Sequence, residues 1–127
     1  MPINSYIDET KKLTVFKVTG ELLYDEAISV VKSFYEGQPT ENVLWDLSDI
    51  TEIHITSEQV ESIENLIQRF KSARSKGKTA FVAPNDLVYG LSRMFNTFGE
   101  ISGSPFQRWA FRSMEEAYQW LSEEDSS

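Results

Sequence analysis

The sequence predicts an α/β domain whose elements follow the order β-β-α-β-α-β-α-β-α. Apolar residues alternate with polar ones over short segments, they recur at helical spacing over longer segments, and the two kinds of segment take turns along the chain. Strands that are separated by helices run parallel and are joined by right-handed crossovers. We therefore expect a mixed sheet of about five strands, with the helices mainly on one face because two strands keep a polar side.

The first half of the chain contains two paired strands, a helix and a buried strand. Residues 6–8 and 13–19 flank the polar turn ETKK, and the second segment alternates as a half-buried hairpin strand does. Apolar residues then recur at helical spacing behind an acidic start, until Gly37 and Pro39 end the helix. Residues 42–47 hold the apolar run VLW and predict a strand buried on both faces. The polar residues after it predict a loop.

A second helix is expected to begin in the segment TSEQ. Thr56 and Gln59 match the capping box, in which the side chain of each residue bonds the backbone of the other. An apolar stripe starts at Val60 and continues at helical spacing to Phe70. Basic residues gather around the expected end of this helix, where they would interact favourably with its dipole. They are Arg69, Lys71, Arg74, Lys76 and Lys78.

The second half of the chain repeats the alternation of strand and helix. Residues 78–83 predict a short strand, and Asn85 predicts a turn and the cap of a third helix. The polar segment GEISGSP follows that helix, and the alternation in residues 106–112 predicts a strand with one wet face or one open edge. Ser113 and Glu116 match a second capping box, which predicts the last helix.

Length and composition indicate a single domain. The 127 residues, of which 40% are hydrophobic, suit one domain over 1–127, with an ordered core at about 5–121 and an acidic tail at 122–127. The segment MPINSYIDET lacks the basic and apolar regions of a signal peptide, and no apolar run approaches the ~20 residues that cross a bilayer. We expect a cytoplasmic protein that is not transmembrane. The absence of cysteine excludes disulfides and thiolate metal sites.

The charge and the residue types argue against nucleic-acid binding and catalysis. A formal net charge of -8 disfavours a polyanionic partner, because nucleic-acid binding depends on neutralising phosphates. His54 is the only histidine, so a catalytic triad that depends on histidine would have to use His54 as its base. A metal site would need three or four converging ligands. The six glycines make no phosphate loop. We expect no enzyme activity, no cofactor and no metal, and we interpret His54 as a packed or surface residue.

Several segments together resemble the STAS superfamily, in particular its small SpoIIAA-like single-domain proteins. The resemblance covers about residues 5–121 and rests on the order of elements and on five segments. These segments are VLWDLSDI, the helix that begins near TSEQ, GKTAFVAP, GLSRMF and FRSMEEAYQWL. The resemblance implies a sheet layered with helices on one side, in a small soluble bacterial protein.

The resemblance also implies a function. In the anti-sigma-factor antagonists of this superfamily, a partner kinase phosphorylates a serine at the start of the helix after the second core strand, and that state controls docking. Thr56 and Ser57 are the residues here that match it, which implies a regulatory or protein-interaction module whose partner is a kinase or an anti-sigma-like regulator. The expected partner surface consists of Thr56, Ser57, Glu58 and Gln59. On physical grounds alone, simple helix capping remains an alternative role for these hydroxyls.

A second hypothesis is a carrier or sensor for a small apolar, lipid-like ligand, to which the resemblance to SEC14-type domains also points. The third helix has more apolar residues than one narrow stripe requires, and the surplus could line a pocket. The candidate pocket residues are Leu87, Tyr89, Leu91, Met94, Phe95 and Phe98. Core packing or a homodimer interface are the alternative roles for this surface.

Overall fold

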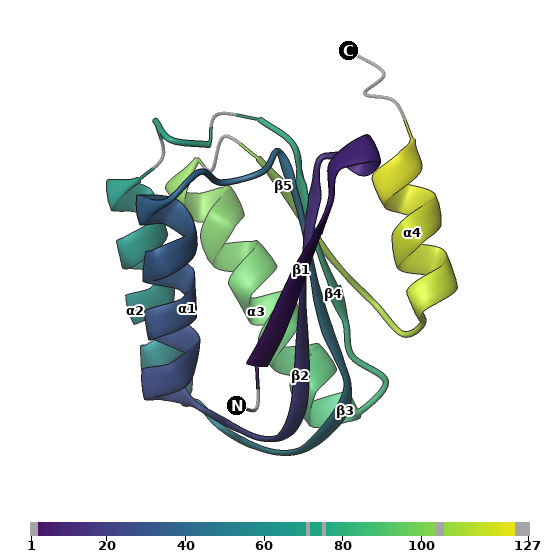
Figure 1. Cartoon of the computed structure of the whole chain (residues 1–127). Coiled ribbons are helices and arrows are strands. Elements are labelled where there is room, and N and C mark those ends of the chain that lie inside the picture. Colours follow the sequence, from purple (N-terminus) through teal and green to yellow (C-terminus); the bar gives the residue numbers. More distant parts are fainter. Residues whose placement is uncertain (1–2, 71, 75, 104–105, 124–127) are drawn as a thin grey trace.

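The computed structural model describes residues 3–70, 72–74, 76–103 and 106–123, and Figure 1 shows their arrangement. The elements are β1 (Ile3–Asp8), a short 3-10 helix (Glu9–Lys11), β2 (Leu13–Leu23), α1 (Tyr24–Glu36), β3 (Asn42–His54), α2 (Ser57–Arg69), β4 (Lys78–Val82), α3 (Asp86–Ser102), β5 (Gln107–Phe111) and α4 (Met114–Ser122). No helix within these ranges is both long and apolar enough to cross a membrane.

The strands form one mixed five-stranded sheet in the order β1-β2-β3-β4-β5. β1 is antiparallel to β2, and every later neighbour is parallel. A hairpin can be antiparallel because its connection is short, whereas each parallel pair requires a crossover, which α1, α2 and α3 supply. The predicted α/β class, element order and mixed sheet are confirmed.

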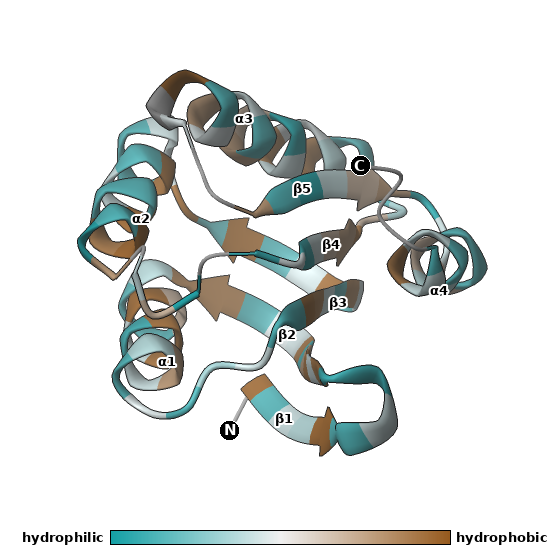
Figure 2. Cartoon of the chain, turned by 90° about the horizontal axis from the view of Figure 1, so that it is seen from above, coloured by the Kyte–Doolittle hydropathy of each residue, from teal (hydrophilic) through white to brown (hydrophobic). Residues whose placement is uncertain are grey.

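The helices lie on both faces of the sheet, but unequally. α1, α2 and α3 cover one face, and α4 packs against the other, as Figures 1 and 2 show. The expected layering on mainly one face is therefore confirmed, and α4 is the exception. It is held by apolar side chains that β2, β3 and β4 direct to its side of the sheet. These are Leu13, Val15, Leu44, Ala80 and Val82, which enclose Ala117 of α4.

The larger core lies between the sheet and α1–α3. It combines residues that alternate along the strands with residues that recur at helical spacing, so each element contributes one apolar face. Within it, the rings of Phe16 and Trp45 stack across β2 and β3 with centroids 4.5 Å apart. Phe81 of β4 meets Phe95 of α3 edge-on, with ring centroids 5.4 Å apart. These contacts fix the sheet against the helices.

Several elements are longer than the sequence predicts, namely β1, β2, β3 and α3. β3 continues through the polar residues that predict a loop, because β2 also continues and pairs Glu21 with Glu52 and Leu23 with His54. A neighbouring strand supplies the backbone hydrogen bonds that an isolated polar segment lacks. α3 likewise extends into the polar segment GEISGSP and ends at Gly103, whose left-handed conformation (φ +70°) is favourable for glycine.

Candidate functional site

The carboxyl ends of the parallel strands and the N-termini of the helices share one end of the molecule, at the bottom of Figure 1. We call it the strand-end face. β2 and β3 extend farther along the sheet than β4, whose pairing with β3 stops at Val82. The loop that joins β3 to α2 therefore starts from a two-stranded extension. The strand-end face is where open α/β sheets usually carry their binding residues.

The capping box at the start of α2 forms as predicted. Thr56 adopts extended backbone geometry and its Oγ1 accepts the amide N–H of Gln59 at 3.2 Å. The amide N–H of Thr56 in turn donates to Oε1 of Gln59 at 2.9 Å. Both side chains of the box are thus engaged with the backbone, which leaves the Thr56 hydroxyl committed to the cap.

Ser57 is differently placed from its neighbour. It is the first residue of α2 and is exposed, and its hydroxyl forms no hydrogen bond to any residue that the structure describes. Glu58, also exposed, follows it in the first turn. The amide N–H groups of a helix's first turn have no partner within the helix, and the dipole favours an anion beside them. Both residues are exposed, but Ser57 has the hydroxyl that is free of the cap, whereas the oxygen of Thr56 accepts the capping hydrogen bond.

Acidic groups surround the start of α2. Nε2 of His54 lies 3.0 Å from Oε2 of Glu52 and 3.9 Å from Oε2 of Glu21, so the end of β3 meets the end of β2. All three residues are exposed. Their potential ligand atoms lie within 4.8 Å of one another, so among the described residues these three are the group that is close enough together to bind a metal ion. The sequence did not indicate that Glu21 lies near His54, because only the pairing of β2 with β3 brings the two residues together.

The six candidate pocket residues of α3 do not line one common cavity. Leu91 and Phe95 line a partly open cavity, together with Val88 and Ser92. Leu87, in contrast, is 63% exposed. The other candidates also lie away from the cavity: the guanidinium of Arg112 covers the ring of Tyr89 at 4.0 Å, and Met94 and Phe98 are half-buried elsewhere on the helix.

Of the six candidate pocket residues, Leu91 and Phe95 line this cavity, and Leu87, Tyr89, Met94 and Phe98 do not. An amphipathic helix buries one stripe, and surplus apolar residues at its edges meet solvent or neighbouring side chains instead. The cavity itself lies between the sheet and α1–α3, with a volume of about 110 Å³.

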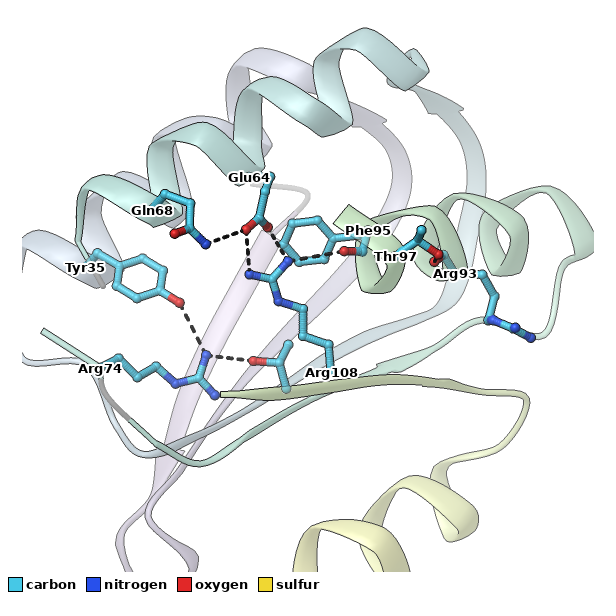
Figure 3. A network of polar contacts seen from close by, with 9 residues as sticks. Tyr35, Glu64, Gln68, Arg74, Arg93, Phe95, Thr97 and Arg108 are labelled. Carbon is cyan, nitrogen blue, oxygen red and sulfur yellow. Dashed lines mark hydrogen bonds and ion pairs between the residues drawn. The ribbon is translucent and has the colours of Figure 1, made fainter. Parts of the chain in front are cut away.

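A buried ion pair links α2 to β5, and sequence analysis missed it. Glu64 and Arg108 have side chains only 2% exposed, and the Arg108 guanidinium donates to both carboxylate oxygens of Glu64, with Nη2 3.0 Å from Oε1. Figure 3 shows Gln68 donating to the same carboxylate, at 2.8 Å, and Arg108 also donating to the backbone oxygen of Phe95, at 3.2 Å. The sequence did contain a sign of this pair, because Glu64 is a charged residue at a position of the apolar stripe of α2.

A second arginine, Arg74, is buried close to this pair. The prediction that Arg74 stabilises the end of α2 was wrong, because α2 already ends at Arg69. Arg74 is 4% exposed and donates hydrogen bonds to the backbone oxygens of Glu41, just before β3, and of Lys78, the first residue of β4. Its guanidinium donates to the hydroxyls of Tyr35 (3.3 Å) and Thr79 (2.7 Å). Burial lowers the pKa of Arg74 and raises the pKa of the Tyr35 phenol.

Lys78 also departs from the predicted basic cluster. Its ammonium donates to the backbone oxygens of Trp120 (2.8 Å) and Glu123 (2.7 Å), so it stabilises the C-terminal end of α4 rather than α2. Arg69 alone lies in the last turn of α2. Lys71 lies outside the described residues, as do 124–127 of the predicted acidic tail.

Comparison with solved structures identifies the architecture. A protein from Shewanella loihica described as having a SpoIIAA-like fold superposes with a TM-score of 0.57 at 18% identity, over 94% of this chain and 91% of that chain. The unphosphorylated anti-sigma factor antagonist SpoIIAA gives a TM-score of 0.57 at 14% identity, over 92% and 94%. The chain has a SpoIIAA-like fold.

This fold is the one that the resemblance to the STAS superfamily implied. The Bacillus cell fate determinant SpoIIAA in its phosphorylated form also matches, with a TM-score of 0.52 at 13% identity over 94% of this chain and 98% of that chain. No protein-family model matches the sequence, and no curated protein matches it significantly. The SpoIIAA-like assignment therefore concerns architecture.

Proposed function

We propose that this SpoIIAA-like domain is a non-catalytic regulatory module that docks a protein partner with the start of α2. The docking surface comprises Thr56, Ser57, Glu58 and Gln59, and phosphorylation of Ser57 controls the docking. The partner is a protein kinase or an anti-sigma-like regulator. One observation carries the proposal: an exposed serine with an uncommitted hydroxyl stands at the first position of a capped helix.

The structural neighbours support this choice of function. One neighbour is described as an anti-sigma factor antagonist in its unphosphorylated form, and another as a cell fate determinant in its phosphorylated form. Both share the SpoIIAA-like fold with this chain. These neighbours favour a phosphorylation-controlled regulator over the lipid carrier that the sequence left open.

The chemistry of the helix start is compatible with phosphorylation. A phosphate on Ser57 would meet the amide groups of the first turn and the positive end of the helix dipole, while the cap made by Thr56 and Gln59 stays intact. Glu52 and Glu58 already make this surface acidic. A phosphoryl group would therefore raise the local negative charge sharply and would change docking through electrostatics rather than through refolding.

The experiment begins with protein isolated from its native cells. Mass spectrometry should find phosphate on Ser57 and not on Thr56, because the Thr56 hydroxyl is bound to the backbone. The copurified partner is then titrated with Ser57→Ala, Ser57→Asp and the matched control Ser62→Asp, an exposed serine farther along the same helix.

We expect Ser57→Asp to change partner affinity about tenfold, or about 1.4 kcal/mol, because it adds charge within the docking surface, and we expect Ser62→Asp to change it little. Ser57→Ala should bind the partner as the unmodified protein does. Equal affinities for Ser57→Asp and Ser62→Asp would refute control at the helix start.

A further inference from the structure

The cavity under α1–α3 is partly open and has walls that are almost entirely apolar. It measures about 110 Å³ and lies between the sheet and the three helices on its larger face. Leu22, Val31, Trp45, Ile67 and Phe81 are among its lining residues. An apolar cavity of about 150 Å³ engineered into another protein stays dry and accepts benzene, so a void of this size is suited to a small organic group. A long acyl chain exceeds it.

Apart from Ser92, whose hydroxyl donates to the backbone oxygen of Val88, the polar side chains of the wall are Tyr35, Arg74 and Thr79. Arg74, Tyr35 and Thr79 all line the cavity, and Arg74 hydrogen-bonds both of the other two, so the three groups are neighbours. Figure 3 shows the Tyr35 hydroxyl directed at the Arg74 guanidinium. The ring of Phe106 lies against the same guanidinium at 4.0 Å. The cavity thus has an apolar body and one cationic corner.

Among the described residues, no carboxylate oxygen lies within ion-pair distance of Arg74, and Glu41, whose charge acts on it from farther away, pairs with Lys76. The four hydrogen-bond acceptors of Arg74 are the backbone oxygens of Glu41 (3.0 Å) and Lys78 (2.8 Å) and the two hydroxyls, all of them neutral. Four acceptors also leave one of its five N–H groups available. The nearby Arg108 contrasts with it, because Glu64 neutralises that guanidinium. Buried charges are normally held in ion pairs, whereas Arg74, which is 4% exposed, is held by neutral hydrogen-bond acceptors only.

We propose that this cavity is a binding site for a small monocarboxylate with a short branched apolar body, whose carboxylate pairs with Arg74. The apolar wall accommodates the hydrocarbon part, and the guanidinium and the Tyr35 hydroxyl supply donors to the carboxylate. The cavity lies behind the docking surface at the start of α2, since Ile55 and Val60, which flank that surface in the sequence, line it. Binding there goes beyond the proposed regulatory function and would add a metabolite input to the same domain.

The test uses the full chain and three probes. They are 3-methylbutanoate, its neutral amide 3-methylbutanamide, and the long-chain carboxylate myristate, each titrated while amide chemical shifts and melting temperature are recorded. We expect 3-methylbutanoate to bind about tenfold or more tightly than the amide, because hydrogen bonds to a charged group are the stronger kind. The largest shifts should occur at Arg74 and Tyr35, and myristate should not compete.

Two variants test whether the probe binds inside the cavity, and neither of them changes Arg74. Ala27 of α1 is buried and lines the cavity, so Ala27→Leu fills part of the void, whereas Ser29→Leu adds the same group to an exposed position of the same helix. Ala27→Leu should abolish binding of 3-methylbutanoate without lowering the melting temperature, and Ser29→Leu should bind as the unchanged protein does.

Each of the other outcomes overturns part or all of the proposal. Equal binding of acid and amide would remove the role of Arg74, tight binding of myristate would refute the size limit, and full binding by Ala27→Leu would show that the probe sits elsewhere. No binding of 3-methylbutanoate by the unchanged protein would refute the site itself.

Discussion

Breaking the Glu64–Arg108 pair should destabilise the protein strongly. Each side chain is 2% exposed, so the loss of one partner leaves a charge in the interior with no compensation. We expect Glu64→Leu or Arg108→Met to lower the free energy of unfolding by about 3–5 kcal/mol. The double variant should recover much of this loss, because two apolar groups of similar size need no pairing.

The assay is urea denaturation followed by tryptophan fluorescence. For a slope of about 2 kcal/mol per molar, each single variant should move the midpoint down by about 2 M. Lys76→Met is the matched control, because Lys76 forms a surface pair with Glu41 (3.2 Å) and its own side chain is 77% exposed. Pairs of that kind contribute about 0–1 kcal/mol.

The double-mutant cycle decides whether the pair acts as a unit. We expect a coupling energy above about 1 kcal/mol between Glu64 and Arg108, since they share two hydrogen bonds across α2 and β5. If the two losses simply add, or if each single variant behaves like Lys76→Met, then the buried pair does not hold α2 against β5 and the reasoning fails.

Three further predictions concern single positions. Thr56→Ala should lower stability by about 1 kcal/mol in denaturant melts, whereas Thr56→Asp should retain it because aspartate also caps. Gly77→Ala should cost at least about 2 kcal/mol, because φ is +106° and a Cβ would meet a backbone oxygen at 1.9 Å, while Gly90→Ala, with open space around it, should not destabilise. Burial, followed by the hydrogen bond and charge of Tyr6, raises the pKa of Tyr118 from 10.0 to about 12. The unfolded phenol ionises first, so this stability is full below pH 10 and is lost between 10 and about 12, and Tyr118→Phe should flatten that loss in melts across pH.

Local features of the protein could be predicted from the sequence because their causes are local. The capping box depends on Thr56 and on Gln59 three residues later, and both bonds form. The order of strands and helices follows from apolar periodicity, which each segment carries by itself. The parallel sheet then follows from the crossover connections.

The lengths of the strands were less predictable from the sequence, because a strand continues as long as a neighbouring strand pairs with it. The polar residues after Leu47 read as a loop in isolation, yet they continue β3 as far as His54 once the end of β2 lies beside them. The same pairing brings Glu21 to His54. Strand pairing satisfies backbone groups whatever the side chains prefer, so polarity alone marks the end of a strand poorly.

The sequence by itself determined the order of the strands and helices and the capped start of α2 with its two hydroxyls, Thr56 and Ser57, because these are properties of short segments. Only the tertiary structure decided which charges are buried. Arg74 looked like one of several basic residues near a helix end, and Arg108 like the polar side of an edge strand, but packing places both under the helices. The physical reason is that a charge is stable in the interior only where distant segments supply its partners, as Glu64 does for Arg108 and as Tyr35 and Thr79 do for Arg74.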